Sequence, residues 1–177
     1  MCLFSLCVGV AMLVKKYRLR IEGVEMRPDE LGISQWSVGQ SYRLHYKGSR
    51  DVQPFILSVN GDLKVAMAYP GFLGDSFAMK DGALVLPPLA KGAAHIQGQV
   101  DEQRYFLVFP EPPSDSDEDW ALWIQERQKD LSFHALKEGG KDATKDRTWH
   151  AQVLKSWAAS FGERKQAPEV IVYTVER

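Results

Sequence analysis

Histidine is the residue in this chain best suited to acid–base chemistry or metal binding, because imidazole titrates near neutral pH. No two histidines are four residues apart, as they are in a helical zinc pair, and the H-E-x-x-H motif is absent. We therefore predict no zinc site and interpret all the histidines as ordinary core or surface residues. The sequence holds four: His45, His95, His134 and His150.

Short motifs for nucleophilic or phosphate chemistry are also missing. The sequence has no G-x-S-x-G nucleophile turn and neither GxxxxGK[ST] nor GxGxxG. Both cysteines, Cys2 and Cys7, lie in the apolar N-terminal segment, so the rest of the chain has no thiol for catalysis, a disulfide or a metal site. We predict no catalytic residues, no metal site and no cofactor.

A small hydrolase is the least favoured alternative. Its only motivation is that Asp146, His150 and Ser156 lie within one short region, where they would have to converge in a pocket. The acidic cluster at residues 115–119 fits the positive end of a helix dipole better than a catalytic pair, because consecutive helical positions point in different directions.

Tryptophan supplies the remaining candidate site. We favour a helix pair that packs its rings onto a sheet, because buried aromatic side chains contribute large areas. The alternative is an exposed aromatic patch that binds a protein partner. Four of the five tryptophans lie in the C-terminal third and are the candidate partner-binding residues: Trp120, Trp123, Trp149 and Trp157.

Alternation of apolar and polar residues predicts a β-rich body. The dipeptide Asn60-Gly61 predicts a type I′ turn, which would join residues 54–59 and 63–69 as an antiparallel hairpin. Residues 26–36 carry no regular pattern and are predicted to be irregular. Strands are expected at residues 17–24, 41–47, 54–59, 63–69, 83–86, 95–100, 103–109 and 170–175.

Helical spacing follows a proline-rich stretch that begins at Pro110. A first helix, capped by Ser114 or Ser116, is expected to end at residues 139–140, and a second to span residues 148–161. This order predicts one α+β domain over residues 17–177, mainly an antiparallel β sandwich or half-barrel with two C-terminal helices in the subregion 114–165. A short hydrophobic N-terminal segment, residues 1–16, precedes it.

Net charge and the apolar N-terminus bear on location and partners. A formal charge of -1 and a pI near 6.4 argue against nucleic-acid binding.

The run from Met1 to Val14 has no charge and ends at two lysines, which favours the end of a transmembrane helix over a signal-peptide core or a buried first element. We expect a single-pass membrane protein. Its orientation stays open, because the basic residues after this run also suit the solvent face of a strand.

Four stretches resemble a family of bacterial β-rich domains of unknown function. The resemblance spans roughly residues 18–113 and is one of strand rhythm and turns. It implies an interaction domain without catalytic residues, of the kind attached to membrane-anchored, anti-sigma-factor-like and signalling proteins. The zinc-binding part of anti-sigma factors, with its His and Cys ligands, is missing here. The stretches are SVGQSYRLHY (37–46), PFILSVNGDLKVAMAYPG (54–71), LVLPPL (84–89) and RYFLVFPEPP (104–113).

These observations predict a non-enzymatic sensing or protein-interaction module tethered to a bacterial membrane, of which anti-sigma-factor-like regulation is one form. The alternative is a soluble subunit of a multi-protein assembly that docks through its Trp-rich helices. A contiguous exposed aromatic patch would favour this alternative.

Overall fold

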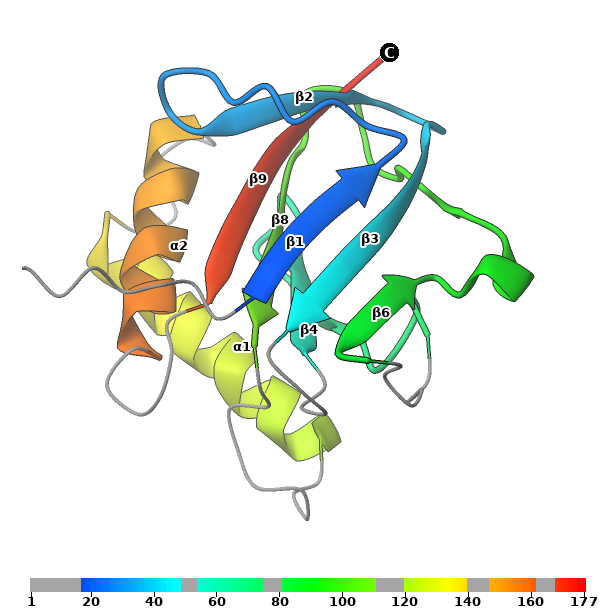
Figure 1. Ribbon diagram of the computed structural model, residues 1–177. Coiled ribbons are helices and arrows are strands. Elements are labelled where there is room, and N and C mark those ends of the chain that lie inside the picture. Colours follow the sequence, from blue (N-terminus) through cyan, green and yellow to red (C-terminus); the bar gives the residue numbers. More distant parts are fainter. Residues whose placement is uncertain (1–16, 49–53, 75–80, 111–119, 140–146, 162–167) are drawn as a thin grey trace, which may run out of the picture.

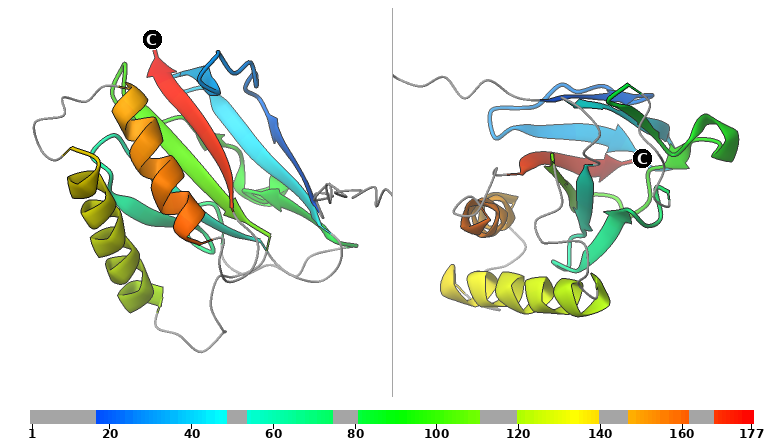
Figure 2. Two further views of the ribbon diagram at one scale, coloured as in Figure 1. Left: turned by 90° about the vertical axis from the view of Figure 1, so that its left-hand side faces the viewer. Right: turned by 60° about the horizontal axis from the view of Figure 1, so that its bottom comes forward.

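The computed structural model describes residues 17–48, 54–74, 81–110, 120–139, 147–161 and 168–177. These residues form three layers: a small sheet, a larger sheet and a pair of helices (Figures 1 and 2). The strands are β1 (Tyr17–Glu22), β2 (Ile33–Ser37), β3 (Ser41–Gly48), β4 (Phe55–Val59), β5 (Val65–Tyr69), β6 (Ala83–Leu86), β7 (Ala94–His95), β8 (Gln103–Phe109) and β9 (Glu169–Glu176). The helices are α1 (Trp120–Lys137), α2 (Arg147–Ser160) and the short 3-10 helix η1 (Leu89–Lys91).

The larger sheet contains segments from both halves of the chain. Its strand order is β2-β9-β8-β4-β5, and all its neighbours are antiparallel except β2 and β9. The smaller sheet has the order β1-β3-β6, with β7 paired to one end of β3. This arrangement confirms the predicted α+β class with a β sandwich and two C-terminal helices.

Strand β8 is buried on both faces, which explains its nearly continuous apolar sequence QRYFLVF. Its alternate residues Tyr105, Leu107 and Phe109 belong to the core against the helices. Phe106 and Val108, between them, belong to the core between the two sheets. The middle strand of the domain therefore joins both hydrophobic cores.

The core between the sheets is rich in aromatic rings. Trp36 of β2 stacks on Tyr173 of β9 with ring centroids 4.2 Å apart, and Phe106 lies 5.8 Å from the same tyrosine. From the small sheet, β3 contributes Tyr42, which lies 6.0 Å from Phe106. In the neighbouring strand β1, Arg18 and Arg20 are exposed. They alternate with residues that face the core, as expected for a strand with one face in solvent.

The helical layer covers the other face of the larger sheet (Figure 2). Trp123 of α1 meets Phe55 of β4 edge to face, and Trp157 of α2 contacts Phe161 in the same geometry. Leu131 and Leu154 are also buried in this core. The helices thus contribute aromatic rings to the packing against the sheet, the arrangement that the sequence favoured.

Three local predictions were wrong. Residues 33–37 form strand β2, although the segment was predicted to be irregular; its partner β9 lies far along the chain. The strand predicted at 95–100 reduces to the two residues of β7, because Gly98 and Asp101 take positive φ values and turn the chain.

The turn between β4 and β5 also differs from the expected type. The hairpin pairs Val59 with Val65, so a longer loop joins the strands. Leu63, with a φ of 58°, is the loop residue in the left-handed region, and not Asn60 or Gly61. The Asn60 side chain instead accepts hydrogen bonds from the backbone N–H groups of Asp62 and Lys64.

Several expectations concern residues outside the described ranges. They include the Met1 to Val14 segment, the helix cap at Ser114 or Ser116 and the acidic cluster at 115–119. Within the described ranges, neither helix combines the length and apolar character that a membrane span needs.

A side chain of α1 completes the hydrogen bonding of the edge strand β5. Gln128 accepts a hydrogen bond from the Val65 N–H at 2.8 Å and donates one to the Leu63 carbonyl at 3.0 Å. Its amide therefore takes the place of a neighbouring strand at this edge, which fixes α1 against the sheet.

We predict that Gln128→Ala lowers the free energy of unfolding by about 1–3 kcal/mol, because two half-buried backbone groups lose their partner. Urea unfolding measures this change. Gln125→Ala, at an exposed position of the same helix, is the control and should stay within about 0.5 kcal/mol of the wild type. Equal effects of the two substitutions would contradict the role of Gln128.

A second prediction concerns the pair that joins β1 and β3 on the solvent side. The hydrogen bond from His45 Nε2 to Glu22 Oε2, at 2.6 Å, is the main reason why the pKa of Glu22 lies below its ordinary value of 4.5. Because the folded pKa is lowered, this contribution to stability is present above pH 4.5 and is lost as the pH falls through the folded pKa. His45→Val should raise the pKa of Glu22 in an NMR titration, whereas Lys47→Val on the same strand should leave it unchanged.

Candidate ligand-binding pocket

A cavity of about 640 Å³ opens between the larger sheet and the segment that carries η1 and β7. We call it the aromatic pocket. Phe106 and Tyr173 contribute from β8 and β9, Tyr42 from β3, and Phe72 from the loop after β5. Lys91, His95, Gln97 and Arg104 supply its principal polar side chains. Apolar walls with a few converging polar groups are the usual composition of a small-molecule site.

Tyr42 and Tyr173 are neutral hydrogen-bond donors at physiological pH. Burial raises the pKa of Tyr173 to about 12, and the nearby Glu102 adds to this effect while Arg104 opposes it. Burial also raises the pKa of Tyr42, with a further contribution from Tyr173. Each hydroxyl therefore keeps its proton, so each can donate a hydrogen bond to an acceptor on a ligand.

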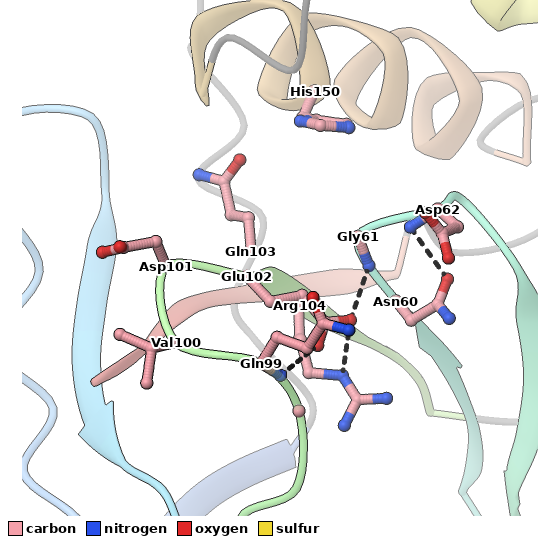
Figure 3. Close-up of a pocket in the computed structure, with 11 residues that line it drawn as sticks. Asn60, Gly61, Asp62, Gln99, Val100, Asp101, Glu102, Gln103, Arg104 and His150 are labelled. Carbon is pink, nitrogen blue, oxygen red and sulfur yellow. Dashed lines mark hydrogen bonds and ion pairs between the residues drawn. The ribbon is translucent and has the colours of Figure 1, made fainter. Parts of the chain in front are cut away.

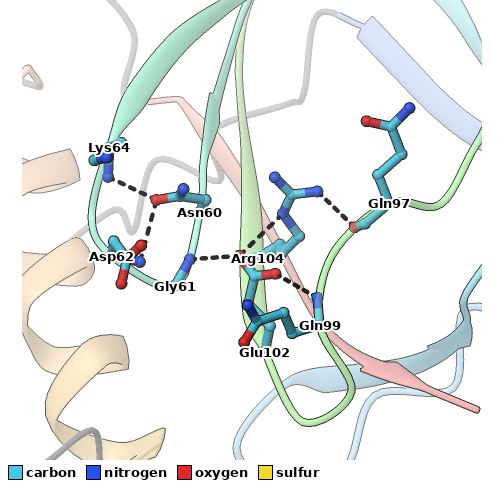
Figure 4. Close-up of polar contacts among 8 residues, drawn as sticks. All are labelled: Asn60, Gly61, Asp62, Lys64, Gln97, Gln99, Glu102 and Arg104. Carbon is cyan, nitrogen blue, oxygen red and sulfur yellow. Dashed lines mark hydrogen bonds and ion pairs between the residues drawn. The ribbon is translucent and has the colours of Figure 1, made fainter.

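Arg104 is held in place by a network that Figure 4 shows. Its Nη1 donates to the backbone carbonyl of Gln97, and its Nε lies 3.5 Å from Glu102 Oε1. Glu102 in turn accepts hydrogen bonds from the backbone N–H groups of Gly61, at 3.0 Å, and Gln99, at 2.8 Å. The network fixes the guanidinium beside the pocket and ties the loop before β8 to the turn after β4.

The charge lining the aromatic pocket is of one sign. Lys91 and Arg104 are cationic, and none of the described residues that line it is acidic. His95 Nδ1 lies 3.2 Å from the Gly39 carbonyl and 3.3 Å from the Ser41 hydroxyl. The pocket suits an anion.

A rigid turn places an exposed phenyl ring at the rim of the pocket. Phe72 is 61% exposed, although it follows a strand and lies between two hydrogen bonds that pair Gly71 with Gly74. A Cβ atom at Gly71 would stand 2.3 Å from the Met67 carbonyl oxygen, so this turn requires glycine. Phe72 therefore contributes an exposed apolar group to the lining of the pocket.

A second cavity of about 680 Å³ lies beyond Arg104, toward α2, and we call it the polar cleft (Figure 3). The turn after β4 provides Asn60 and Asp62, the loop before β8 provides Asp101, and α2 provides His150. Its chemistry is distinct from that of the aromatic pocket, since most of its side chains carry planar polar groups.

The four candidate tryptophans do not form one exposed patch. Trp157 is 0% exposed and Trp123 is 8% exposed, so both belong to the core. Trp149 is half-buried and donates from Nε1 to the Glu138 carbonyl at 3.0 Å. Trp120 begins α1, but its side chain lies outside the described part of the chain. Burial thus removes two of the four from any partner-binding surface.

The two described residues of the hydrolase alternative, His150 and Ser156, lie in different surroundings. Ser156 Oγ lies 3.2 Å from His134 Nδ1, in a contact between the helices, and His150 lines the polar cleft. Asp146 is outside the described residues. Across the described residues, no group of three or more His, Cys, Asp or Glu side chains could hold a metal ion.

Apart from His150, which the hydrolase alternative named, the sequence did not indicate the residues of either cavity. Alternation correctly indicates that Tyr42 points into the core, but nothing local distinguishes it from Tyr46 on the same face. The aromatic pocket combines Tyr42, Lys91, Arg104 and Tyr173, which come from four separate elements. Only the strand pairing brings them together.

Comparisons with protein-family models, with curated proteins and with solved structures found no match. The resemblance to bacterial β-rich domains therefore stays a prediction. The features that bear on function are the geometry and charge of the two cavities.

Proposed function

We propose that this domain is a non-enzymatic sensing module that binds a small organic anion in the aromatic pocket. The observation that carries the proposal is the pairing of aromatic walls with cationic side chains and no acidic residue among those described. A ring or aliphatic body would lie against Phe106 and Tyr173, and its anionic group would face Lys91 and Arg104.

The energetics favour an anion over a neutral or cationic ligand. Hydrogen bonds to charged groups contribute about 1.5–3 kcal/mol, roughly twice the contribution of neutral pairs. The hydroxyls of Tyr42 and Tyr173 are neutral, and a carboxylate can accept hydrogen bonds from them. Glu102 balances part of the charge of Arg104, and Lys91 is the second cationic side chain in the lining. A cation would face the positive charges of Lys91 and Arg104, with no acidic side chain among the described lining residues to offset them.

The membrane tether remains part of the proposal. The uncharged run from Met1 to Val14, followed by Lys15 and Lys16, supports attachment of the sensing domain to a bacterial membrane. A protein partner would then carry the signal onward, in the manner of anti-sigma-factor-like regulators.

One observation favours the alternative of a subunit that docks through its helices. Leu122, Phe133 and Leu136 are 55%, 67% and 63% exposed. Their spacing of 11 and 3 residues places them along one side of α1. If the helical layer binds a protein, these aliphatic and phenyl groups would make the contact in place of the buried tryptophans.

We predict that benzoate binds with a Kd of about 1 mM, which corresponds to about 4 kcal/mol. Benzylamine has the same ring with the opposite charge and should bind at least about tenfold more weakly. NMR titration of backbone amides measures both. Equal affinity for the two compounds would contradict the proposed preference for anions.

Substitutions locate the binding in the same titration. Lys91→Glu should raise the Kd for benzoate at least about fivefold, because it reverses a charge that lines the pocket. Tyr42→Phe keeps the ring and removes one donor, which should cost about 0.5–1.5 kcal/mol. Lys129→Glu makes the same charge change on the exposed side of α1 and should leave the Kd unchanged.

Membrane fractionation tests the tether. The full chain should require detergent for release, whereas a chain that starts at Tyr17 should be soluble and folded, because the apolar run is then missing. If the full chain is soluble and the truncated chain is unstable, residues 1–16 belong to the folded core and the tether is wrong.

A further inference from the structure

The polar cleft contains a buried donor that lacks a partner. Gln103 is only 4% exposed, and its Oε1 accepts a hydrogen bond from the Tyr105 hydroxyl at 2.8 Å. No described residue accepts a hydrogen bond from its Nε2. Figure 3 shows the carboxamide extending from β8 toward α2, the helix that carries His150. Buried donors normally have an acceptor, so this amide points to one that the described residues do not supply.

The neighbouring strand repeats this feature. Thr174 of β9 is paired with Gln103, so both side chains point to the helical side of the sheet. Thr174 is 1% exposed, and its hydroxyl also has no hydrogen-bond partner among the described residues. Two adjacent buried polar groups are thus unsatisfied at one end of the larger sheet, beside an open cleft.

The rest of the cleft offers acceptors as well as donors. Asp62 and Asp101 present carboxylates, which only accept, and the Asn60 amide can do both. Glu102 is already bonded to Gly61 and Gln99. Every lining side chain apart from Val100 carries a planar polar group.

This mixture excludes simple ions as good ligands. An organic cation would pair with Asp62 and Asp101 but would leave the Gln103 donor without an acceptor. An anion would satisfy Gln103 and attract Arg104, but it would meet the two carboxylates. A hydroxyl group both donates and accepts, so a ligand with several hydroxyls can satisfy the amide and the carboxylates together.

We propose that the polar cleft is a saccharide-binding site, in which one sugar hydroxyl accepts from Gln103 Nε2 and others donate to Asp62 and Asp101. The site is separate from the aromatic pocket in position and in charge, so it adds a second ligand class to the proposed function. Arg104 lines both cavities.

The test is an NMR titration of the full chain with D-glucose, D-galactose and N-acetyl-D-glucosamine, each to about 100 mM, which detects dissociation constants in the millimolar range. The readout is the side-chain NH₂ signal of Gln103, assigned by its loss in Gln103→Ala. At least one sugar should shift this signal in a saturable manner, while putrescine and acetate should not. Failure of all three sugars, or an equal shift with either ion, would overturn the proposal.

A substitution at an exposed position tests sugar binding without disturbing the folded core. Asp62 is exposed, so Asp62→Ala should fold normally and raise the Kd for the sugar at least about fivefold. Glu126→Ala, which removes an exposed carboxylate on α1, should have no effect. Benzoate binding should be unchanged in Asp62→Ala, which separates this site from the aromatic pocket. An unchanged sugar affinity in Asp62→Ala would also overturn the proposal.

Discussion

The burial of strand β8 on both faces is the constraint on which the rest of the structure depends. Its alternating side chains hold the sandwich on one side and the helices on the other. The same alternation continues at the beginning of the strand. Gln103 points to the helical side and lines the polar cleft, whereas Arg104 points to the opposite side and lines both cavities. Two consecutive residues of one strand therefore serve two cavities of different chemistry.

Glu102, immediately before this strand, connects the two cavities. Its carboxylate faces Arg104 and also accepts from the N–H groups of Gly61 and Gln99, which belong to the wall of the polar cleft. An anion that approaches Arg104 competes with Glu102 for the guanidinium. Glu102 also holds the loops of Gly61 and Gln99. A ligand in the aromatic pocket that draws Arg104 away from Glu102 would therefore also affect these loops of the polar cleft. The Glu102 carboxylate is therefore a physical connection between the two cavities.

The fold was largely predictable, because alternation, turn residues and helical spacing are local signals. Strand β2 was missed because its sequence ISQWS owes its conformation to parallel pairing with β9, at the other end of the chain. The turn at Asn60 was assigned the wrong type because the Asn60 side chain, and not a positive φ, organises the loop. The cavities had no such signal. From the sequence alone, Gln103 and Arg104 look like ordinary strand residues, because the neighbours that form the cavities come from other parts of the chain.

The central claim is that the aromatic pocket binds an organic anion, and crystals soaked with 4-bromobenzoate test it most directly. The anomalous signal of bromine locates the ring without ambiguity. We expect one bromine peak within the cavity bounded by Tyr42, Phe72 and Tyr173, with the carboxylate toward Lys91 and Arg104. A bromine peak only elsewhere on the protein, with this cavity empty at saturating concentration, would contradict it.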